Sequence, residues 1–573
     1  MKKIISYILS GVMLLSLTAC AATPSPSGIE NNTTPPEVTA SPSPAPTFPT
    51  YPEESADITD LSEYTIVYPS YYDEYKMNEV FLLKDAIKNV TGAELDIISD
   101  GEEKREHEII FASSKRQNGV EESISMFESG LDYIVGALNG NIILGGNNFY
   151  ADMRAVYDFI NNYLGYNDID NIYSEPQKSI DGINFRIYQK PLFTFYANNG
   201  AVSMFTEQYA VRDLHEAHFN LVDADLNWAT YEQFRDFIKW CARYDIFIVV
   251  GLQKWFELYY DCPVIWGHFL RDEPPISTYA DISRQCDEYT EKYKQYNWKP
   301  WVNFFGFDKH WNILTETDGL FDSVPRVSFD RYFANKILQE NDELLTVYES
   351  ARDYAQKKNQ ELWTYIQSYN CLNENIHTDK TFRWSSYISM CFGATGILYF
   401  QYGDSSPNYS TEGDWSGGAL INWDYSKNPA WYHAKAANEE LLKIAEVYLR
   451  YQNIGAYVIN RKELHISAYL NDPYPYTDDF IKELVLPDGT SDTYLTGLFN
   501  KKNGDGKALI IVNLEDIDER AYEQSEERIV KIKLNGENAV FYRNGEPQSI
   551  QTDENGYYLL NISNGYCWFI TFE

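Results

Sequence analysis

Apolar positions between residues 193 and 451 recur as eight short runs, each of a length suited to one buried strand. Helical spacing separates most of them, as at 231–243 and 279–293, whereas the link at 254–263 has room only for a loop or a single turn. Alternating strands and helices over about 250 residues predict a (β/α)8 TIM barrel. The expected strands begin at Phe193, His218, Ile246, Val264, Pro300, Val327, Leu362 and Ile397.

The regions on either side of the expected barrel (191–455) show other patterns. Residues 59–190 combine short strands with helical spacing at 78–89 and 150–164, which predicts a small α/β domain. Residues 460–573 form short alternating runs separated by Gly and Asn turns, which predicts a β-sandwich. The sequence therefore predicts an α/β multidomain protein.

The amino terminus has the pattern of an export signal. Two lysines precede an apolar stretch that is too short to span a bilayer, and Leu17-Thr18-Ala19-Cys20 resembles the lipobox of bacterial lipoproteins. Residues 1–20 are therefore expected to be a lipoprotein signal peptide, with Cys20 lipidated at the extracellular face of the bacterial membrane. An ordinary secretory signal that happens to end in Cys is the alternative. Residues 21–58 are rich in Pro, Ser and Thr, which predicts an extended tether.

Charge narrows the choice of partner. The chain has 47 basic and 84 acidic residues and a net charge of −37, which disfavours nucleic acid because phosphate binding requires clustered Lys and Arg. The 47 Tyr and 13 Trp offer flat apolar faces suited to sugars, although most are expected in cores. The cysteines form no CxxC pair, so neither a metal nor a cofactor is expected, and disulfides stay undecided.

The candidate chemistry begins at Arg271-Asp272-Glu273-Pro274. This segment ends the fourth expected strand, where a parallel barrel delivers side chains to its mouth. An N-cap before a short helix is the alternative explanation for an Asp next to a Pro. Other polar residues end the remaining strands, and a ring of amides, acids and phenols suits a neutral polyhydroxylated substrate. The expected substrate-binding residues are Asn198, Asp225, Asn303, Asp330, Tyr332, Gln367 and Tyr402.

The fourth-strand run Trp266 to Pro274 and the segments at 301–303, 328–332, 363–367 and 393–400 resemble bacterial barrel glycoside hydrolases. The small domain resembles the one that precedes the barrel in family-20 β-hexosaminidases and family-67 α-glucuronidases. In the large clan of retaining β-glycosidases, a fourth-strand Glu is the acid/base and a seventh-strand Glu is the nucleophile. Here the seventh strand ends in Gln367, and an amide cannot form the glycosyl ester.

A second resemblance accounts for that departure. In family-20 and family-123 hexosaminidases an Asp-Glu pair ends the fourth strand, the Glu protonates the leaving oxygen, and the Asp orients the substrate's 2-acetamido group as nucleophile. This resemblance implies that Glu273 is the general acid/base and that Asp272 assists the acetamide of an N-acetylated glycan. Two alternatives stay open. Asp330 could partner Glu273, as in α-galactosidase-like barrels, or the protein could be a non-catalytic carbohydrate-binding lipoprotein.

Overall fold

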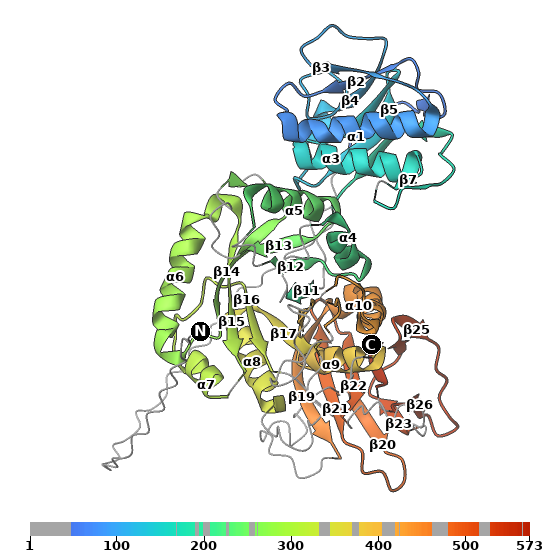
Figure 1. The fold of residues 1–573 in the computed structure, drawn as a ribbon. Helices are drawn as coiled ribbons and strands as arrows, with labels where there is room; N and C mark the ends of the chain where they lie inside the picture. The colour runs from blue at the N-terminus through green and yellow to red at the C-terminus, as the bar shows by residue number, and fades with distance from the viewer. Residues whose placement is uncertain are drawn as a thin grey trace, which may run out of the picture. The chain divides into compact units, whose positions relative to one another are not determined.

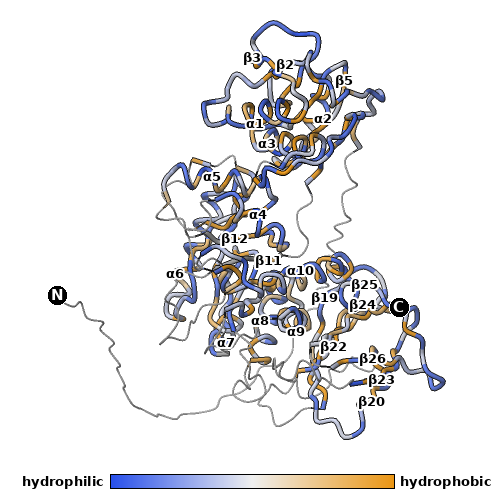
Figure 2. The backbone as a smooth tube through the Cα atoms, turned by 45° about the vertical axis from the view of Figure 1, so that its right-hand side comes forward, coloured by the Kyte–Doolittle hydropathy of each residue, from blue (hydrophilic) through white to orange (hydrophobic). Residues whose placement is uncertain are grey.

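Figure 1 shows the protein in a computed structural model. The structure describes residues 47–167, 169–188, 194–198, 207–224, 229–250, 258–259, 262–306, 308–331, 344–369, 378–403, 419–422, 424–460, 479–514, 528–563 and 565–573. Residues from Pro49 to Glu573 form one unit, which contains a small mixed sheet, a barrel and two antiparallel sheets in chain order. The chain is therefore a multidomain α/β protein. Figure 2 shows hydrophobic and hydrophilic segments alternating along the chain.

The first domain is built on a six-stranded sheet with the order β10-β5-β6-β4-β2-β3. Helices α1 (Glu74–Thr91) and α3 (Phe149–Asp158) lie together on one face of the sheet (Figure 1). Helix α1 begins where the Asp73 side chain accepts a hydrogen bond from the Lys76 amide, and it ends at Gly92 in the left-handed conformation. The strands are β2 (Tyr64–Tyr68), β3 (Asp96–Ser99), β4 (His107–Phe111), β5 (Tyr133–Leu138), β6 (Asn141–Gly145) and β10 (Ile183–Arg186).

The folded part of the chain begins inside the segment expected to be a tether. Strand β1 (Ser55–Asp57) pairs antiparallel with β9 (Ser179–Asp181), and the side chains of Ala56 and Ile58 are buried. The folded part therefore begins a few residues before the expected boundary at 58. Composition could not show this, because three residues suffice to add a strand to a partner that is far away in sequence. The remaining short elements of the domain are α2 (Glu121–Ser125), the π-helical turn Phe159–Tyr163, β7 (Tyr166–Asn167) and β8 (Ile172–Tyr173).

Eight parallel strands close into a barrel in chain order, as the apolar runs predicted. They are β11 (Thr194–Asn198), β12 (Leu221–Ala224), β13 (Phe247–Val250), β14 (Ile265–Asp272), β15 (Lys299–Phe305), β16 (Arg326–Asp330), β17 (Glu361–Gln367) and β18 (Gly396–Phe400). Among the described residues of the link from β13 to β14 there is no α-helix. The helices of this domain are α4 (Gln208–Glu216), α5 (Tyr231–Arg243), α6 (Tyr279–Lys292), α7 (Asp308–Glu316), α8 (Leu344–Lys358), α9 (Asp379–Cys391) and α10 (Pro429–Tyr448).

Aromatic side chains fill the interior of the barrel. Trp266, Trp301 and Trp363 contact one another with ring centroids 5.5–6.4 Å apart. The Arg326 guanidinium lies 3.5 Å from the Trp266 ring centroid and 4.3 Å from that of Trp363, and burial lowers its pKa to about 9. At Gly396 a Cβ atom would lie 2.7 Å from the Trp363 ring, so only glycine fits. The barrel interior is filled by side chains, so a ligand site is expected at an end of the barrel.

The C-terminal domain has a six-stranded sheet (β19-β21-β22-β27-β24-β25) and a three-stranded sheet (β20-β23-β26), both antiparallel. One hydrophobic cluster draws on both sheets, with Leu509 and Ile570 from the first and Val530 and Leu560 from the second. Two sheets thus enclose one core. The strands are β19 (Tyr451–Ile459), β20 (Ile481–Val485), β21 (Tyr494–Lys501), β22 (Lys507–Asn513), β23 (Ile529–Leu534), β24 (Val540–Arg543), β25 (Glu546–Gln548), β26 (Tyr558–Asn561) and β27 (Cys567–Phe572).

The border between the barrel and the C-terminal domain differs from the expected one at 455. Strand β19 begins at Tyr451, three residues after α10 ends at Tyr448, and pairs with β21 of the C-terminal sheet. Residues 461–478, near the start of the region expected to be a β-sandwich, lie outside the described residues. The described cysteines are buried, namely Cys241, Cys262, Cys286, Cys391 and Cys567. In the part of the chain that the structure describes, no helix has the length and apolar character needed to cross a membrane.

Strand β14 approaches β15 so closely that residue 267 must be glycine. A Cβ atom at Gly267 would lie 1.9 Å from the backbone oxygen of Lys299 on β15. We expect Gly267→Ala to lower the free energy of unfolding by about 1–3 kcal/mol or more, because the two strands must separate. Chemical denaturation would measure this loss. Gly101→Ala is the matched control, since its Cβ would meet only Ser99 Oγ at 3.9 Å. Equal losses in the two variants would contradict the expectation.

Candidate active site

Three neighbouring strands bring acidic and amide side chains together at the carboxyl end of the barrel. Strand β14 ends at Asp272, with Glu273 next in the chain, and β16 ends at Asp330. Between them β15 carries Asn303, which lies opposite Asp272 in the strand register. A bulge in β14 between Phe269 and Arg271 shifts this register just before the acids, and such bulges redirect the side chains that follow.

The Asn303 side chain joins two of the carboxylates. Its Nδ2 donates to Asp272 Oδ1 at 3.0 Å and to Asp330 Oδ1 at 3.1 Å. The side chain is 3% exposed, so both hydrogen bonds are shielded from water on the Asn303 side. A primary amide has two N–H donors, and here each carboxylate receives one of them. Asn303 therefore stabilises negative charge on Asp272 and Asp330 at the same time.

Glu273 has an unusual backbone conformation. Its φ is +40°, a region that side chains with a Cβ rarely adopt, and its N–H donates to the Asn303 backbone oxygen at 2.9 Å. Such a conformation costs on the order of 1–3 kcal/mol and persists only where surrounding contacts impose it. The hydrogen bond to β15 is one such contact. The backbone thus holds the Glu273 side chain beside its acidic neighbours instead of letting it turn away.

Glu273 and Asp330 share a hydrogen bond between their side chains, which requires one proton on the pair. Partial burial, this bond and the charges of Asp330 and Asp272 raise the pKa of Glu273 to about 8. Burial raises the pKa of Asp330 too, but the hydrogen bonds from Glu273 and Asn303 oppose that shift. A pKa of about 8 leaves Glu273 mostly protonated near neutral pH, beside the Asp330 carboxyl group, whose own pKa is also raised.

Asp272 differs from its two partners in its exposure to solvent. Its side chain is open to water, although the surrounding barrel wall still desolvates it enough to raise its pKa. The hydrogen bond from Asn303 favours the charged form. Asp272 is thus a carboxylate that a ligand in the mouth could reach.

Gln367 ends β17, the next strand of the barrel, and is 9% exposed. Its Nε2 donates to the Tyr369 backbone oxygen at 3.1 Å. Its Oε1 is buried and accepts no hydrogen bond from the described residues. Gln367 therefore holds a buried acceptor that no described residue satisfies.

The structure describes only part of the remaining residues that were expected to bind substrate at the mouth. Tyr402 is 1% exposed, and its ring lies 5.3 Å from that of Phe219. Tyr402 is therefore a core residue and not a ligand contact. It follows a strand, which suggested a position at the mouth, but its side chain packs in the interior. Asn198 ends β11, but its side chain is not described. Asp225 and Tyr332 lie outside the described residues, as does Cys20.

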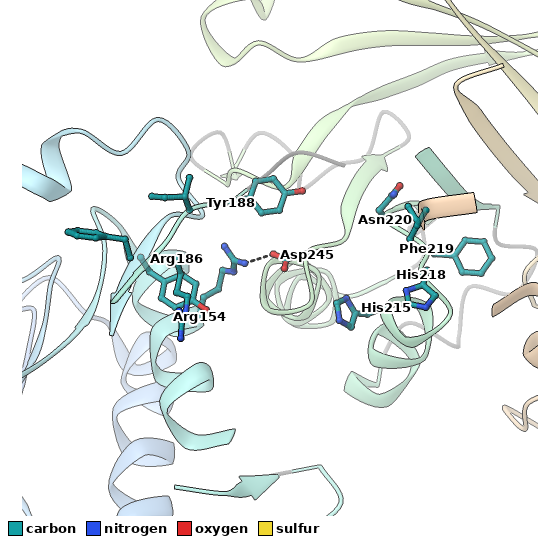
Figure 3. Close-up of a pocket in the computed structure, with 12 residues that line it drawn as sticks. Arg154, Arg186, Tyr188, His215, His218, Phe219, Asn220 and Asp245 are labelled. Carbon is teal, nitrogen blue, oxygen red and sulfur yellow. Dashed lines mark hydrogen bonds and ion pairs between the residues drawn. The ribbon is translucent and has the colours of Figure 1, made fainter. Parts of the chain in front are cut away.

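A second cavity lies where the small domain meets the start of the barrel strands (Figure 3). Its volume is about 510 Å³, and it is lined by Arg154, Arg186 and Asp245, among others. Asp245 and Asn220 precede β13 and β12, so this cavity is at the opposite ends of the strands from the acids. Arg154 pairs with Asp245, and Arg186 pairs with Asp158 at 3.1 Å. Its cations are already neutralised, so this cavity is not the candidate active site.

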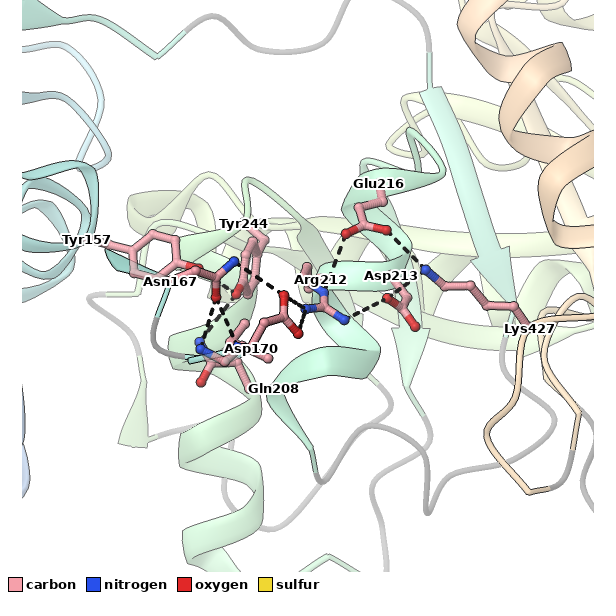
Figure 4. Close-up of polar contacts among 10 residues, drawn as sticks. Tyr157, Asn167, Asp170, Gln208, Arg212, Asp213, Glu216, Tyr244 and Lys427 are labelled. Carbon is pink, nitrogen blue, oxygen red and sulfur yellow. Dashed lines mark hydrogen bonds and ion pairs between the residues drawn. The ribbon is translucent and has the colours of Figure 1, made fainter. Parts of the chain in front are cut away.

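Another polar cluster surrounds Arg212 of α4 (Figure 4). Arg212 pairs with Asp170 of the β7–β8 turn at 2.8 Å and with Glu216 at 3.4 Å. Lys427, just before α10, lies 3.0 Å from both Asp213 and Glu216. These charges satisfy one another and fasten α4 to its neighbours. Among the described residues, the barrel mouth is therefore the candidate active site.

No family model matches the chain, and no curated protein matches it. Among solved structures, a glycoside hydrolase matches with 12% identity and a TM-score of 0.38, over 68% of this chain and 94% of that one. A family 30 subfamily 8 xylanase from Clostridium acetobutylicum matches with 11% identity and a TM-score of 0.34, over 66% and 95%. A family 115 4-O-methyl-α-glucuronidase matches with 9% identity and a TM-score of 0.35, over 69% and 62%. Similarity at this level assigns neither a family nor a substrate.

The raised pKa of Glu273 implies a pH-dependent cost to folding. The folded state holds the proton up to pH of about 8, whereas an unfolded Glu releases it near its ordinary value of 4.5, so this group destabilises the fold increasingly between those values. We expect Glu273→Gln to be more thermostable than the wild type at pH 8 by a few degrees, and much less so at pH 5. Solvent screening at this half-exposed site limits the gain to about 1–2 kcal/mol.

Thermal denaturation across pH 4–9 would measure this difference. Glu103, changed to Gln, serves as the control, because it is an exposed Glu far in the sequence from the barrel mouth. A stability difference for Glu273→Gln that does not change with pH would show that Glu273 is an ordinary surface carboxylate.

Proposed function

We propose that this protein is a glycoside hydrolase in which Glu273 is the general acid/base and Asp330 is its partner carboxylate. The observation that carries the proposal is the convergence of Asp272, Glu273 and Asp330 at the barrel mouth, where Asn303 donates to Asp272 and Asp330 and the pKa of Glu273 is raised to about 8. An acid with a pKa near 8 beside an ionised carboxylate is the pair that glycosidic bond cleavage requires.

The proposed reaction has two steps. Glu273 gives its proton to the glycosidic oxygen while the bond from that oxygen to the anomeric carbon breaks, and the Asp330 carboxylate forms the new bond to that carbon. Glu273, now ionised, then takes a proton from water, whose oxygen attacks the anomeric carbon and displaces Asp330. The sugar leaves with the hydroxyl group. The proton is back on Glu273, and the charge is back on Asp330.

The geometry favours retention of anomeric configuration. Inverting enzymes hold their carboxyl groups about 6.5–9.5 Å apart to admit a water molecule, and retaining enzymes hold them about 5–5.5 Å apart. The side chains of Glu273 and Asp330 lie close enough to affect each other's pKa, which is nearer to the shorter of these two separations. A neutral or N-acetylated glycan is the proposed substrate, because the mouth gathers acids and an amide acceptor.

A second candidate mechanism uses the substrate's own acetamido group, with Asp272 as the assisting carboxylate. It is favoured by one observation: Asp272 is exposed at the mouth and receives a hydrogen bond from Asn303, which keeps it charged and accessible. The two mechanisms assign opposite importance to Asp272 and Asp330. In the substrate-assisted scheme a thiazoline mimic of the intermediate would also bind much more tightly than the sugar.

We expect Glu273→Gln and Asp330→Asn each to lower kcat by at least about a hundredfold, since one removes the proton donor and the other the nucleophile. Asp272→Asn should lower kcat less, on the order of tenfold. Aryl glycosides and aryl N-acetylhexosaminides would serve as substrates, with product anomers followed by NMR. Azide should restore turnover of Asp330→Asn on an activated substrate and yield a glycosyl azide of opposite configuration. Full activity in Asp330→Asn together with loss in Asp272→Asn would select the substrate-assisted mechanism.

The mature protein is proposed to be held at the extracellular face of the bacterial membrane through a lipid on Cys20, with carbohydrate as its partner. This rests on the lipobox-like sequence before Cys20 and on the Pro-rich segment after it. In a bacterial host, Cys20→Ser should abolish incorporation of labelled palmitate and move the protein from the membrane to the soluble fraction. Ser25→Ala, within the same segment, should change neither. Membrane retention of Cys20→Ser would contradict the anchor.

A further inference from the structure

A chain of hydrogen bonds lies directly beneath the carboxylates and begins in the barrel core. Trp301 Nε1 donates to Ser328 Oγ at 2.6 Å, and Ser328 Oγ donates to Asn303 Oδ1 at 3.0 Å. Asn303 Nδ2 then donates to Asp272 and Asp330, as described above. The chain therefore connects a buried indole on β15 to both acidic residues through one hydroxyl and one amide.

The direction of this chain is fixed by its first member. An indole N–H can only donate, so Ser328 Oγ must accept from Trp301 and has its single hydrogen left for another acceptor. The nearer acceptor is Asn303 Oδ1 at 3.0 Å, compared with the Val302 backbone oxygen at 3.4 Å. The amide oxygen of Asn303 consequently faces Ser328, and both amide hydrogens face the acids. The opposite orientation would place the amide oxygen against two carboxylates.

The first two members have no freedom to rearrange. Trp301 and Ser328 are fully buried. The Trp301 ring packs edge-on against Phe269 with centroids 5.4 Å apart and against Trp363 at 5.5 Å. A rotation of the indole would break these contacts and would leave its N–H without the hydroxyl acceptor. The starting point of the chain is thus set by core packing.

We propose that Trp301 and Ser328 are positioning residues that orient the Asn303 amide, so that its two N–H groups face Asp272 and Asp330 and keep both carboxylates charged. The inference deepens the proposed function, on which it rests, because the charge on Asp330 is what places the shared proton on Glu273. Neither Trp301 nor Ser328 contacts the reacting atoms in this scheme. Their effect reaches the reaction through Asn303 alone.

The decisive variant is Ser328→Ala, which removes the donor to Asn303 Oδ1 and the acceptor for Trp301. The amide is then free to turn, Asp330 loses part of its stabilisation as an anion, and the acid limb of the kcat/KM profile should move to higher pH by about one unit. We expect kcat near the optimum to fall about tenfold with little change in KM. Trp301→Phe should shift the acid limb less, since Ser328 can still donate. The double variant Trp301→Phe/Ser328→Ala should shift the acid limb little further than Ser328→Ala alone, because both residues act through the same hydrogen-bond chain.

Ser386→Ala is the matched control. Ser386 is a fully buried serine on α9 whose hydroxyl donates to the Phe382 backbone oxygen, so its loss tests the cost of deleting a buried hydroxyl outside the barrel mouth. We expect it to lower Tm to a similar degree and to leave the pH profile unchanged. A shift of the acid limb in both variants would mean that general destabilisation, and not the chain, moves the profile.

A measurement without substrate separates this inference from the proposed function. Carboxyl ¹³C NMR titration of the full chain labelled at Asp and Glu, with Asp272→Asn, Asp330→Asn and Glu273→Gln for assignment, reports the charge on each acid directly. In Ser328→Ala the Asp330 and Asp272 titrations should move to higher pH even if the protein hydrolyses no sugar tested. Unchanged titrations would overturn the positioning role, whether or not hydrolysis is observed.

Discussion

The barrel mouth concentrates three carboxyl groups, and the cost of bringing like charges together is the constraint that shapes its surroundings. Two unit charges about 4 Å apart repel by about 4 kcal/mol at the effective dielectric constant of a protein surface. The structure reduces this cost in two ways. One proton bridges Glu273 and Asp330, and one amide, that of Asn303, donates to both Asp272 and Asp330. Both features lower the free-energy cost of keeping the three side chains close together.

The aromatic core under the mouth holds the Asn303 amide and the acidic side chains in place. Trp301 and Trp363 fill the barrel so tightly that Gly396 admits no Cβ atom, and Gly267 lets β14 lie against β15. Strand β16 turns Arg326 and Ser328 toward this core, and Asp330, two residues further along, follows the same face. Because side chains alternate along a strand, β16 places the Arg326 guanidinium, the Ser328 hydroxyl and the Asp330 carboxyl group on one face. The polar site is supported by packing rather than by other charges.

The sequence predicted this arrangement unevenly, for physical reasons. The eight barrel strands were correctly predicted because each is a short apolar run. Asp272, Glu273 and Asp330 were expected at strand ends for the same reason, and the structure places them there. The domain borders were missed at β1 and β19, since pairing with a distant strand leaves no local signal. Ser328 was also missed, because a buried hydroxyl is recognised only when its partners on other strands are known. Tyr402 shows the reverse error, in which a polar side chain after a strand belongs to the core.

The position of Asn303 on the strand between the two acids follows from barrel geometry. Neighbouring strands lie about 4.8 Å apart, so β14 and β16 are separated by roughly twice that distance, which exceeds the 5–5.5 Å between the carboxyl groups of retaining glycosidases. Glu273 and Asp330 can meet only by leaning toward each other above β15. The β15 residue beneath them must then form hydrogen bonds to polar atoms on both sides. An apolar side chain cannot form these bonds, and another carboxylate would repel the acids. An amide with two donors meets that requirement, and its orientation matters because its oxygen end would repel the acids that its nitrogen end holds.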